Sequence, residues 1–225
     1  PAVSPSPLRA PPLSFLFSQT KRLAITMTLE FAITWDYRCP FARIVHAHVV
    51  EGIADGADWN VRFVPFSLGQ VHIEEGEAPI WEHPEDDTGL LALQAAVVVR
   101  DTDPDRFPLL HRALFEARHA EGAQLRDEAV LRSLFEANGF DPDPVFAEIA
   151  TGTPLATIRD EHTAAAHDLD VWGVPTFMTD EHAAFVRLME LPVDAADARR
   201  SVERIVEMLA GWPSLNEFKH TSLDR

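Results

Sequence analysis

The strongest constraint on the fold is a strand–helix–strand pattern early in the chain. Residues 29–35 are mostly apolar without regular alternation, which is typical of a strand buried on both faces. From Pro40 to about Ile53 apolar residues recur at helical spacing, and proline is favoured at the first helical position. Residues 58–68 alternate and indicate a second strand. Because a helix joins the two strands, we expect them to pair in parallel within an α/β fold.

The rest of the chain is predicted to contain a run of helices, a hairpin and a final helix. The predicted helices after the second strand cover residues 87–101, 104–122, 127–138, 142–150 and 154–168. Residues 171–178 and 184–189 are predicted to form two short antiparallel strands. Residues 194–210 are predicted to form an amphipathic helix. The expected order is therefore β-α-β, a helical insert, and then β-β-α.

Composition excludes several classes of protein. The 225 residues contain 19 Lys and Arg against 36 Asp and Glu, which gives a net charge of -17. We expect no nucleic-acid partner, because little positive charge is present to displace counterions. No apolar stretch is long enough to span a bilayer, so we expect no membrane partner either. A single cysteine excludes an internal disulfide and a disulfide-stapled secreted scaffold, and we expect a cytoplasmic protein.

The first 26 residues differ in composition from all that follows. Residues 1–26 are rich in proline and serine and contain no acidic residue. Such a composition superficially suits an organelle transit peptide, but the apolar patch at residues 13–17 is shorter than a signal-peptide core. We expect a disordered leader, or translated sequence ahead of a start at Met27.

The only cysteine, Cys39, lies between the first predicted strand and the helix that follows it. Unpaired amide groups and the helix dipole favour an anion there, and cysteines at helix starts have lowered pKa values. Arg38 and Arg43 are expected to stabilise the thiolate further, whereas Asp36 would oppose it. A nucleophile is the functional interpretation. The alternative is that Cys39 is a small buried apolar residue with a purely structural role. Its position in the sequence does not decide between the two interpretations.

A second motif favours the nucleophile. Cys39-Pro40-Phe41-Ala42 together with Val174-Pro175-Thr176 resembles the DsbA-like branch of the thioredoxin superfamily. In that family C-P-x-C opens the first helix, and a distant V-P-T carries a cis-proline that faces the active sulfur. The resemblance implies a thioredoxin-like domain of residues 27–85 and 170–225. Residues 86–169 would then form an inserted helical domain.

The sequence departs from this family at Ala42, which stands where the family has its resolving cysteine. A dithiol enzyme uses that second sulfur to release a mixed disulfide, so Cys39 cannot cycle through an internal disulfide. The resemblance then implies a monothiol oxidoreductase with a low-molecular-weight thiol, glutathione or a bacterial equivalent, as co-substrate.

Two alternatives stay open. One is a thiol-dependent isomerase or transferase, similar to the glutathione transferase and 2-hydroxychromene-2-carboxylate isomerase relatives. The other is a catalytically retired binding module, since the second cysteine is missing. The sequence identifies neither the thiol, nor the acceptor substrate, nor the oligomeric state.

The resemblance also implies a substrate groove around the sulfur. The backbone of Val174 would pair with the thiol substrate, and Pro175 and Thr176 would shape the groove. Further residues expected to line an apolar pocket beside the sulfur are Trp35, Tyr37, Pro40, Phe41 and Trp172. Each of the aromatic residues also fits a position in the core.

Ten histidines in an acidic chain invite a metal hypothesis, but their spacing argues against one. No H-E-x-x-H motif or cysteine pair is present. His46 and His48 would point to different sides of a helix, and His162 and His167 converge only marginally. We therefore expect no metal.

Overall fold

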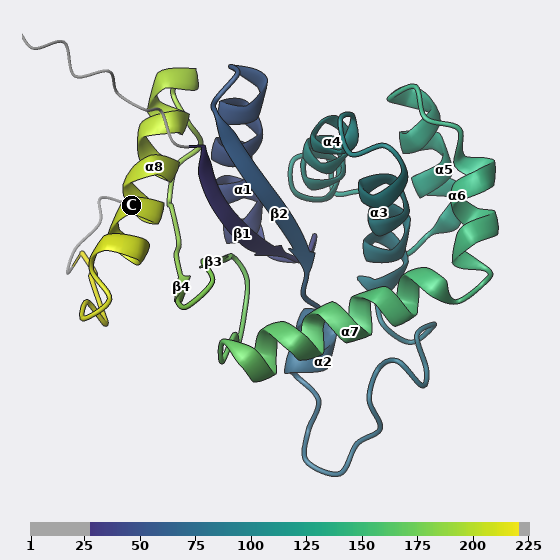
Figure 1. Cartoon of the computed structure of the whole chain (residues 1–225). Coiled ribbons are helices and arrows are strands. Elements are labelled where there is room, and N and C mark those ends of the chain that lie inside the picture. Colours follow the sequence, from purple (N-terminus) through teal and green to yellow (C-terminus); the bar gives the residue numbers. More distant parts are fainter. Residues whose placement is uncertain (1–27, 221–225) are drawn as a thin grey trace, which may run out of the picture.

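The computed structural model describes residues 28–220, and the leader predicted at residues 1–26 lies outside them. Figure 1 shows a small sheet flanked by helices, with a group of further helices beside it. In chain order the elements are β1 (Leu29–Trp35), α1 (Pro40–Ala54), β2 (Trp59–Pro65), α2 (Leu68–Val71), α3 (Leu90–Thr102), α4 (Phe107–His119), α5 (Glu128–Ala137), α6 (Pro142–Ile149), α7 (Thr153–Asp168), β3 (Thr176–Met178), β4 (Ala183–Phe185) and α8 (Ala195–Gly211).

The four strands form one sheet in the order β2-β1-β3-β4. β1 and β2 pair in parallel over their whole lengths, as the helical connection between them predicts. β3 pairs antiparallel with β1, where Ile33 lies opposite Phe177, and also pairs antiparallel with β4. The end of β1 that leads to Cys39 therefore lies beside the start of β3, next to Pro175.

The five helices α3 to α7 agree with the predicted segments to within a few residues. α3 has the most buried residues of them, nine, because it packs against α4, α6, α7 and β2. Figure 1 shows α5 and α6 on the side of α3 away from the sheet, and α7 running back below it towards β3. The division into residues 27–85 with 170–225 and an inserted domain at 86–169 stays a prediction.

The hairpin and the loop after β2 differ from the sequence expectation. β3 and β4 span three residues each, whereas strands were expected over residues 171–178 and 184–189. Before Thr176 the ladder gives way to single hydrogen bonds, in which the carbonyl of Gly173 accepts from the Thr34 hydroxyl and that of Val174 from the Cys39 thiol. The short helix α2 was not predicted; the Ser67 hydroxyl caps it by accepting a hydrogen bond from the amide of Gly69 at 3.2 Å.

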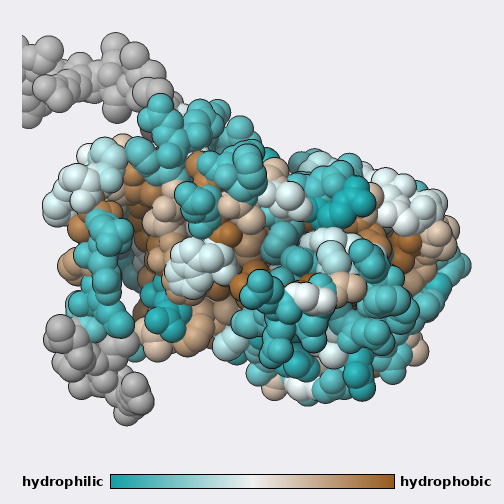
Figure 2. Space-filling model, turned by 90° about the horizontal axis from the view of Figure 1, so that it is seen from below, coloured by the Kyte–Doolittle hydropathy of each residue, from teal (hydrophilic) through white to brown (hydrophobic). Residues whose placement is uncertain are grey.

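One hydrophobic cluster joins the sheet to the helices on both of its sides. In α1 the fully buried residues Ala42, Val45 and Val49 recur at helical spacing, and this helix contacts both α4 and α8. Seen from below in Figure 2, the helical half is mainly hydrophilic, and more hydrophobic surface lies over the half that holds the sheet. Among the described residues, no helix has the length and apolar character needed to cross a membrane.

Candidate functional site

Cys39 is the N-cap residue of α1, with extended backbone angles of φ -87° and ψ 115°. Its sulfur accepts a hydrogen bond from the amide of Ala42 at 3.4 Å, as N-cap side chains do. Its thiol donates to the carbonyl oxygen of Val174, also at 3.4 Å. The side chain is nearly enclosed, since only 8% of the residue is exposed. The sulfur is thus held between the start of α1 and the residue that precedes Pro175.

The segment around Pro175 is built on buried hydrogen bonds. The peptide bond between Val174 and Pro175 is cis. The hydroxyl of Thr34 donates to the carbonyl of Gly173 at 3.2 Å and accepts from the amide of Thr176 at 2.9 Å. The Thr176 hydroxyl donates to the same Gly173 carbonyl at 2.8 Å. Sequence reasoning missed Thr34, although a lone threonine in an otherwise apolar strand end was a visible signal.

The pKa of the Cys39 thiol is raised above its ordinary value, so the expectation of a lowered pKa is wrong. Burial is the largest cause, because it penalises the charged thiolate. The backbone amides of Ala42 and Phe41 lower the pKa, as the helix start predicts, but they do not outweigh burial. The charge of Asp36 raises the pKa and that of Arg187 lowers it. At neutral pH the resting sulfur is therefore mainly a protonated thiol.

The two arginines expected to stabilise the thiolate are engaged elsewhere, which corrects that prediction. Arg38 forms ion pairs with Asp36 at 2.7 Å and with Asp87 at 3.0 Å. Arg43 makes two parallel hydrogen bonds to Glu116, at 2.7 and 3.1 Å. Both guanidinium groups therefore have carboxylate partners in place of the sulfur. Arg187, which sequence reasoning missed because it lies so far along the chain, supplies the favourable charge instead.

The aromatic residues expected beside the sulfur divide into core and surface. Trp35 is fully buried and packs edge-on against Phe63 and His111, so its expected place in a substrate pocket is wrong. Tyr37 is only 1% exposed and belongs to the same core. Of the other residues expected in the pocket, Pro40 and Trp172 are exposed and Phe41 is half-buried. Trp172 is 64% exposed and lies on the ring of Phe185, with ring centroids 4.5 Å apart.

A buried chain of hydrogen bonds runs from Tyr37 into the core. His46 Nε2 lies 3.0 Å from the carbonyl oxygen of Thr34, which can only accept, so this nitrogen carries the hydrogen. His46 Nδ1 must then accept from His111 Nε2 at 2.9 Å. His111 Nδ1 in turn accepts from the Tyr37 hydroxyl at 2.8 Å. Burial lowers the pKa of both histidines and raises that of Tyr37, so all three are neutral. Sequence reasoning missed this chain.

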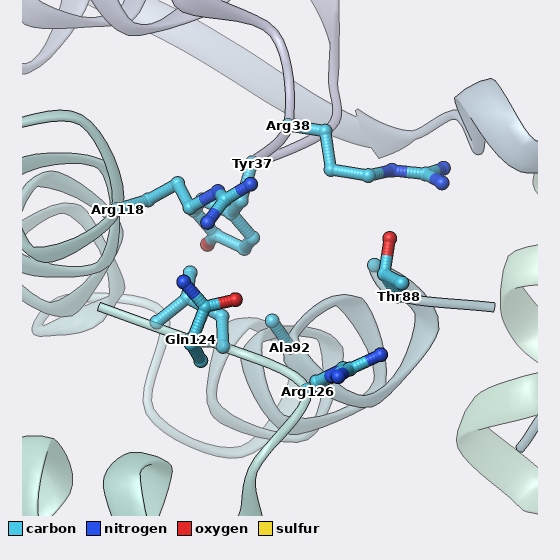
Figure 3. A pocket seen from close by; sticks show the side chains of 9 residues that line it. Tyr37, Arg38, Thr88, Ala92, Arg118, Gln124 and Arg126 are labelled. Atoms are coloured by element: carbon cyan, nitrogen blue, oxygen red, sulfur yellow. The ribbon is translucent and has the colours of Figure 1, made fainter. Parts of the chain in front are cut away.

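A small cavity is lined by Tyr37 and Arg38 and lies between the start of α3 and the loop from α4 to α5. Figure 3 shows the side chains around it, with Arg118 and Gln124 on one side and Thr88 and Arg38 on the other. Its volume of about 20 Å³ is enough for a water molecule but not for a substrate. Within residues 28–220, no group of three or more His, Cys, Asp or Glu side chains is placed to hold a metal ion.

Comparison with known proteins identifies the family. The sequence model of a family described as the DSBA-like thioredoxin domain matches residues 32–192, well over half of the chain. The chain belongs to the DSBA-like thioredoxin family. Its members are generally thiol-disulfide oxidoreductases. The predicted thioredoxin-like α/β fold with a helical insertion is thereby confirmed. No curated protein sequence matches significantly.

Solved structures of the DSBA-like fold resemble the chain over most of its length. Oxidised BdbD from Bacillus subtilis is 16% identical, with a TM-score of 0.53 and coverage of 79% of this chain and 87% of that one. The catalytic domain of Proteus mirabilis ScsC is 17% identical, with a TM-score of 0.55 and coverage of 81% and 86%. The cytosolic disulfide reductase DsbM from Pseudomonas aeruginosa, solved with GSH, is 14% identical, with a TM-score of 0.55 and coverage of 80% and 100%. At these identities the similarity extends to the fold.

Proposed function

We propose that this DSBA-like protein is a monothiol oxidoreductase in which Cys39 exchanges with small thiols and disulfides. The observation that carries the proposal is the position of its sulfur at the start of α1, hydrogen-bonded to the carbonyl of Val174 before the cis Pro175. Ala42 supplies an amide hydrogen to that sulfur but no second thiol. The chain therefore has an attacking sulfur and requires a resolving thiol from solution.

The exchange has two balanced steps. Cys39 loses its proton, and the thiolate attacks a disulfide X–S–S–R at the sulfur bonded to R. The R–S group is the one found in the small thiol R–SH. A Cys39–S–S–R mixed disulfide forms, and X–S⁻ leaves and takes up a proton. One R–SH, as its thiolate, then attacks the mixed disulfide, which forms R–S–S–R and restores Cys39. Overall, X–S–S–R and one R–SH become X–SH and R–S–S–R. Glutathione or a bacterial equivalent is the proposed co-substrate, and no metal takes part.

A thiol-dependent isomerase or transferase is the second candidate. It is favoured by the raised pKa of Cys39, because a protonated, hydrogen-bonding thiol suits positioning a cofactor thiol better than attacking a disulfide. In that case the bound small thiol performs the chemistry and Cys39 only orients it. A catalytically retired binding module would share the geometry but turn over nothing.

The single cysteine makes the experiment direct, because any thiol adduct of the whole chain reports on Cys39. The protein is incubated with oxidised glutathione between pH 6 and 10, and the intact mass is followed with time. We expect one glutathione adduct, reversed by reduced glutathione and absent in Cys39→Ser. Its rate should still rise above the pH at which a free cysteine levels off, because the pKa is raised. If oxidised glutathione formed no adduct at any pH, the proposed role of Cys39 as a nucleophile would be contradicted.

Turnover separates the candidates. Reduction of bis(2-hydroxyethyl) disulfide by glutathione is measured for the wild type and for Cys39→Ser. The oxidoreductase predicts activity that the serine variant loses completely. Retained thiol-dependent activity in Cys39→Ser would support the transferase. Binding of glutathione with neither adduct nor turnover would support the retired binding module.

We also propose that the partners are small thiols or disulfides, without nucleic acid or membrane. We propose a cytoplasmic location, because a reducing compartment supplies the resolving thiol. One structural neighbour of this fold is described as cytosolic and another as periplasmic, so the proposed location rests on the need for a resolving thiol.

A further inference from the structure

Arg187 is an exposed cation whose charge acts on the reactive sulfur. It follows the end of β4, and its guanidinium lies 5.0 Å from the ring centre of Phe41 and 5.7 Å from that of Phe185. Over the part of the chain that the structure describes, no Asp or Glu forms an ion pair with it. Two aromatic rings thus hold the guanidinium in place while its hydrogen-bond donors stay available.

The hairpin places Arg187 directly at the thiol site. Thr176 lies opposite Phe185 in the β3–β4 register, and the amide of Val186 donates to the carbonyl of Pro175 at 3.1 Å. Arg187 follows Val186 directly, and its guanidinium lies over the ring of Phe41, which is two residues after Cys39. The effect of the Arg187 charge on the pKa of Cys39 agrees with this proximity.

The negative net charge of the chain makes a local cation important for binding anionic ligands. A net charge of -17 repels anionic ligands in solution and slows their approach. A guanidinium near the sulfur opposes this repulsion locally. Its planar fork of donors matches a carboxylate with two parallel hydrogen bonds, the strongest common mode of carboxylate recognition.

We propose that Arg187 is a carboxylate-binding residue of the thiol site and selects thiols and disulfides that carry a carboxylate near the sulfur. This inference rests on the proposed exchange at Cys39 and adds the substrate class. The carboxylate binds the guanidinium across the rim formed by Phe41 and Phe185, which brings the ligand sulfur to Cys39. The carboxylate itself takes no part in bond making.

Two alkylating probes that differ mainly in charge test the proposal. The Cys39 thiolate displaces iodide from iodoacetate, an anion, or from iodoacetamide, which is neutral. Both rates are proportional to the fraction of Cys39 that is thiolate, so a change in that fraction cancels in their ratio. We expect Arg187→Gln to lower the iodoacetate-to-iodoacetamide ratio about three- to tenfold, as loss of one nearby positive charge predicts. The effect should shrink at 0.5 M salt.

Arg204→Gln is the matched control, because Arg204 is exposed on α8 and its replacement changes the net charge equally. It should leave the ratio at the wild-type value. If Arg204→Gln lowers the ratio as much as Arg187→Gln, the effect belongs to net charge and the inference is overturned. Circular dichroism of both variants checks that they fold.

Three small disulfides extend the test to exchange itself. Mixed-disulfide formation is followed by mass with dithiodiglycolate, bis(2-hydroxyethyl) disulfide and cystamine, which are anionic, neutral and cationic. The wild type should prefer dithiodiglycolate and Arg187→Gln should lose that preference. Arg187→Lys, which keeps the charge without the fork, should retain part of it. Equal preferences in wild type and Arg187→Gln overturn the inference alone, whereas no reaction with any probe overturns the proposed function.

Discussion

At the scale of single residues, the site is governed by competition between burial and hydrogen bonding. At Cys39 two backbone amides favour the thiolate, yet burial has the larger effect and the pKa rises. At His46 the hydrogen bond to the Thr34 carbonyl favours the charged ring, yet burial again has the larger effect. Loss of the hydrogen bond to the Val174 carbonyl would remove an interaction that favours the protonated thiol and would make the thiolate easier to form.

The buried histidines make stability depend on pH. The pKa of His46 falls from 6.5 to about 4 in the folded chain. Between these values only the unfolded state binds the proton, so stability is fully present above pH 6.5 and is lost as the pH falls towards 4. From pH 7 to pH 5 we expect His46 to contribute a loss of about 2 kcal/mol in the free energy of unfolding.

Urea unfolding at pH 7 and pH 5 measures this loss. His46→Gln should reduce the difference between the two pH values by about that 2 kcal/mol, whatever its stability at pH 7. His83→Gln is the control, since the His83 side chain is 64% exposed, and it should leave the difference unchanged. If the free energy of unfolding depended equally on pH in the wild type and in His46→Gln, His46 would not be a neutral, buried histidine in the folded chain.

At the scale of elements, a buried ion cluster joins the loop before α1 to two other elements. Asp36, with no exposed side-chain surface, accepts hydrogen bonds from Arg38 and from the amide of Leu68 at the start of α2. Asp87 accepts from Arg38 and from the first amides of α3. The absence of a side chain at Gly89 leaves room for Arg38, whose Nε would lie 2.6 Å from an added Cβ. The cluster fixes the turn that carries Cys39.

Removal of Arg38 should therefore be costly. Arg38→Met leaves the carboxylate of Asp36 buried without its cation, and we expect a loss of about 3–5 kcal/mol in the free energy of unfolding. The matched change Arg43→Met breaks the more exposed pair with Glu116 and should cost about 0–1 kcal/mol. Urea unfolding of both variants at pH 7 gives the comparison. Similar losses in the two variants would argue against a special role for the buried cluster.

At the scale of the whole molecule, Trp35 connects the sheet to the helical group. Its ring packs against Phe63 of β2 and against Phe107 of α4, with ring centroids 6.5 and 5.8 Å away. The guanidinium of Arg100, on α3, lies 5.9 Å from the same ring and pairs with Glu161 of α7. Three elements therefore contact this indole of β1, α7 is joined to it through Arg100, and the sheet and the helices share a single core.

Truncation of this indole should weaken the whole chain. We expect Trp35→Ala to lower the free energy of unfolding by about 3–5 kcal/mol, the usual cost of removing a large buried aromatic ring. Trp172→Ala is the control, because Trp172 is 64% exposed, and it should change stability by no more than about 0.5 kcal/mol. Circular dichroism and fluorescence unfolding curves report both values. A loss below 1 kcal/mol in Trp35→Ala would contradict the shared core.

Sequence reasoning succeeded where structure depends on neighbours along the chain. The periodicity of residues 40–53 predicted α1, and the connection through it predicted the parallel pairing of β1 with β2. The lengths of β3 and β4 were overestimated, because apolar residues such as Val171 and Val174 pack in the core without joining the sheet. In this segment, the residues with high strand propensity are buried in the core but do not pair with a neighbouring strand.

By itself the sequence determined the α/β class, the order of the elements and the location of Cys39 at a helix start, since these follow from local spacing and connectivity. The sequence also placed the opposing charge of Asp36 beside the sulfur, but only the tertiary structure decided which cation acts on it. Arg38 and Arg43 are its neighbours in sequence but pair with carboxylates, whereas Arg187 reaches it through the β3–β4 hairpin. The physical reason is that desolvation and Coulomb interactions depend on distance through space and on the exclusion of water.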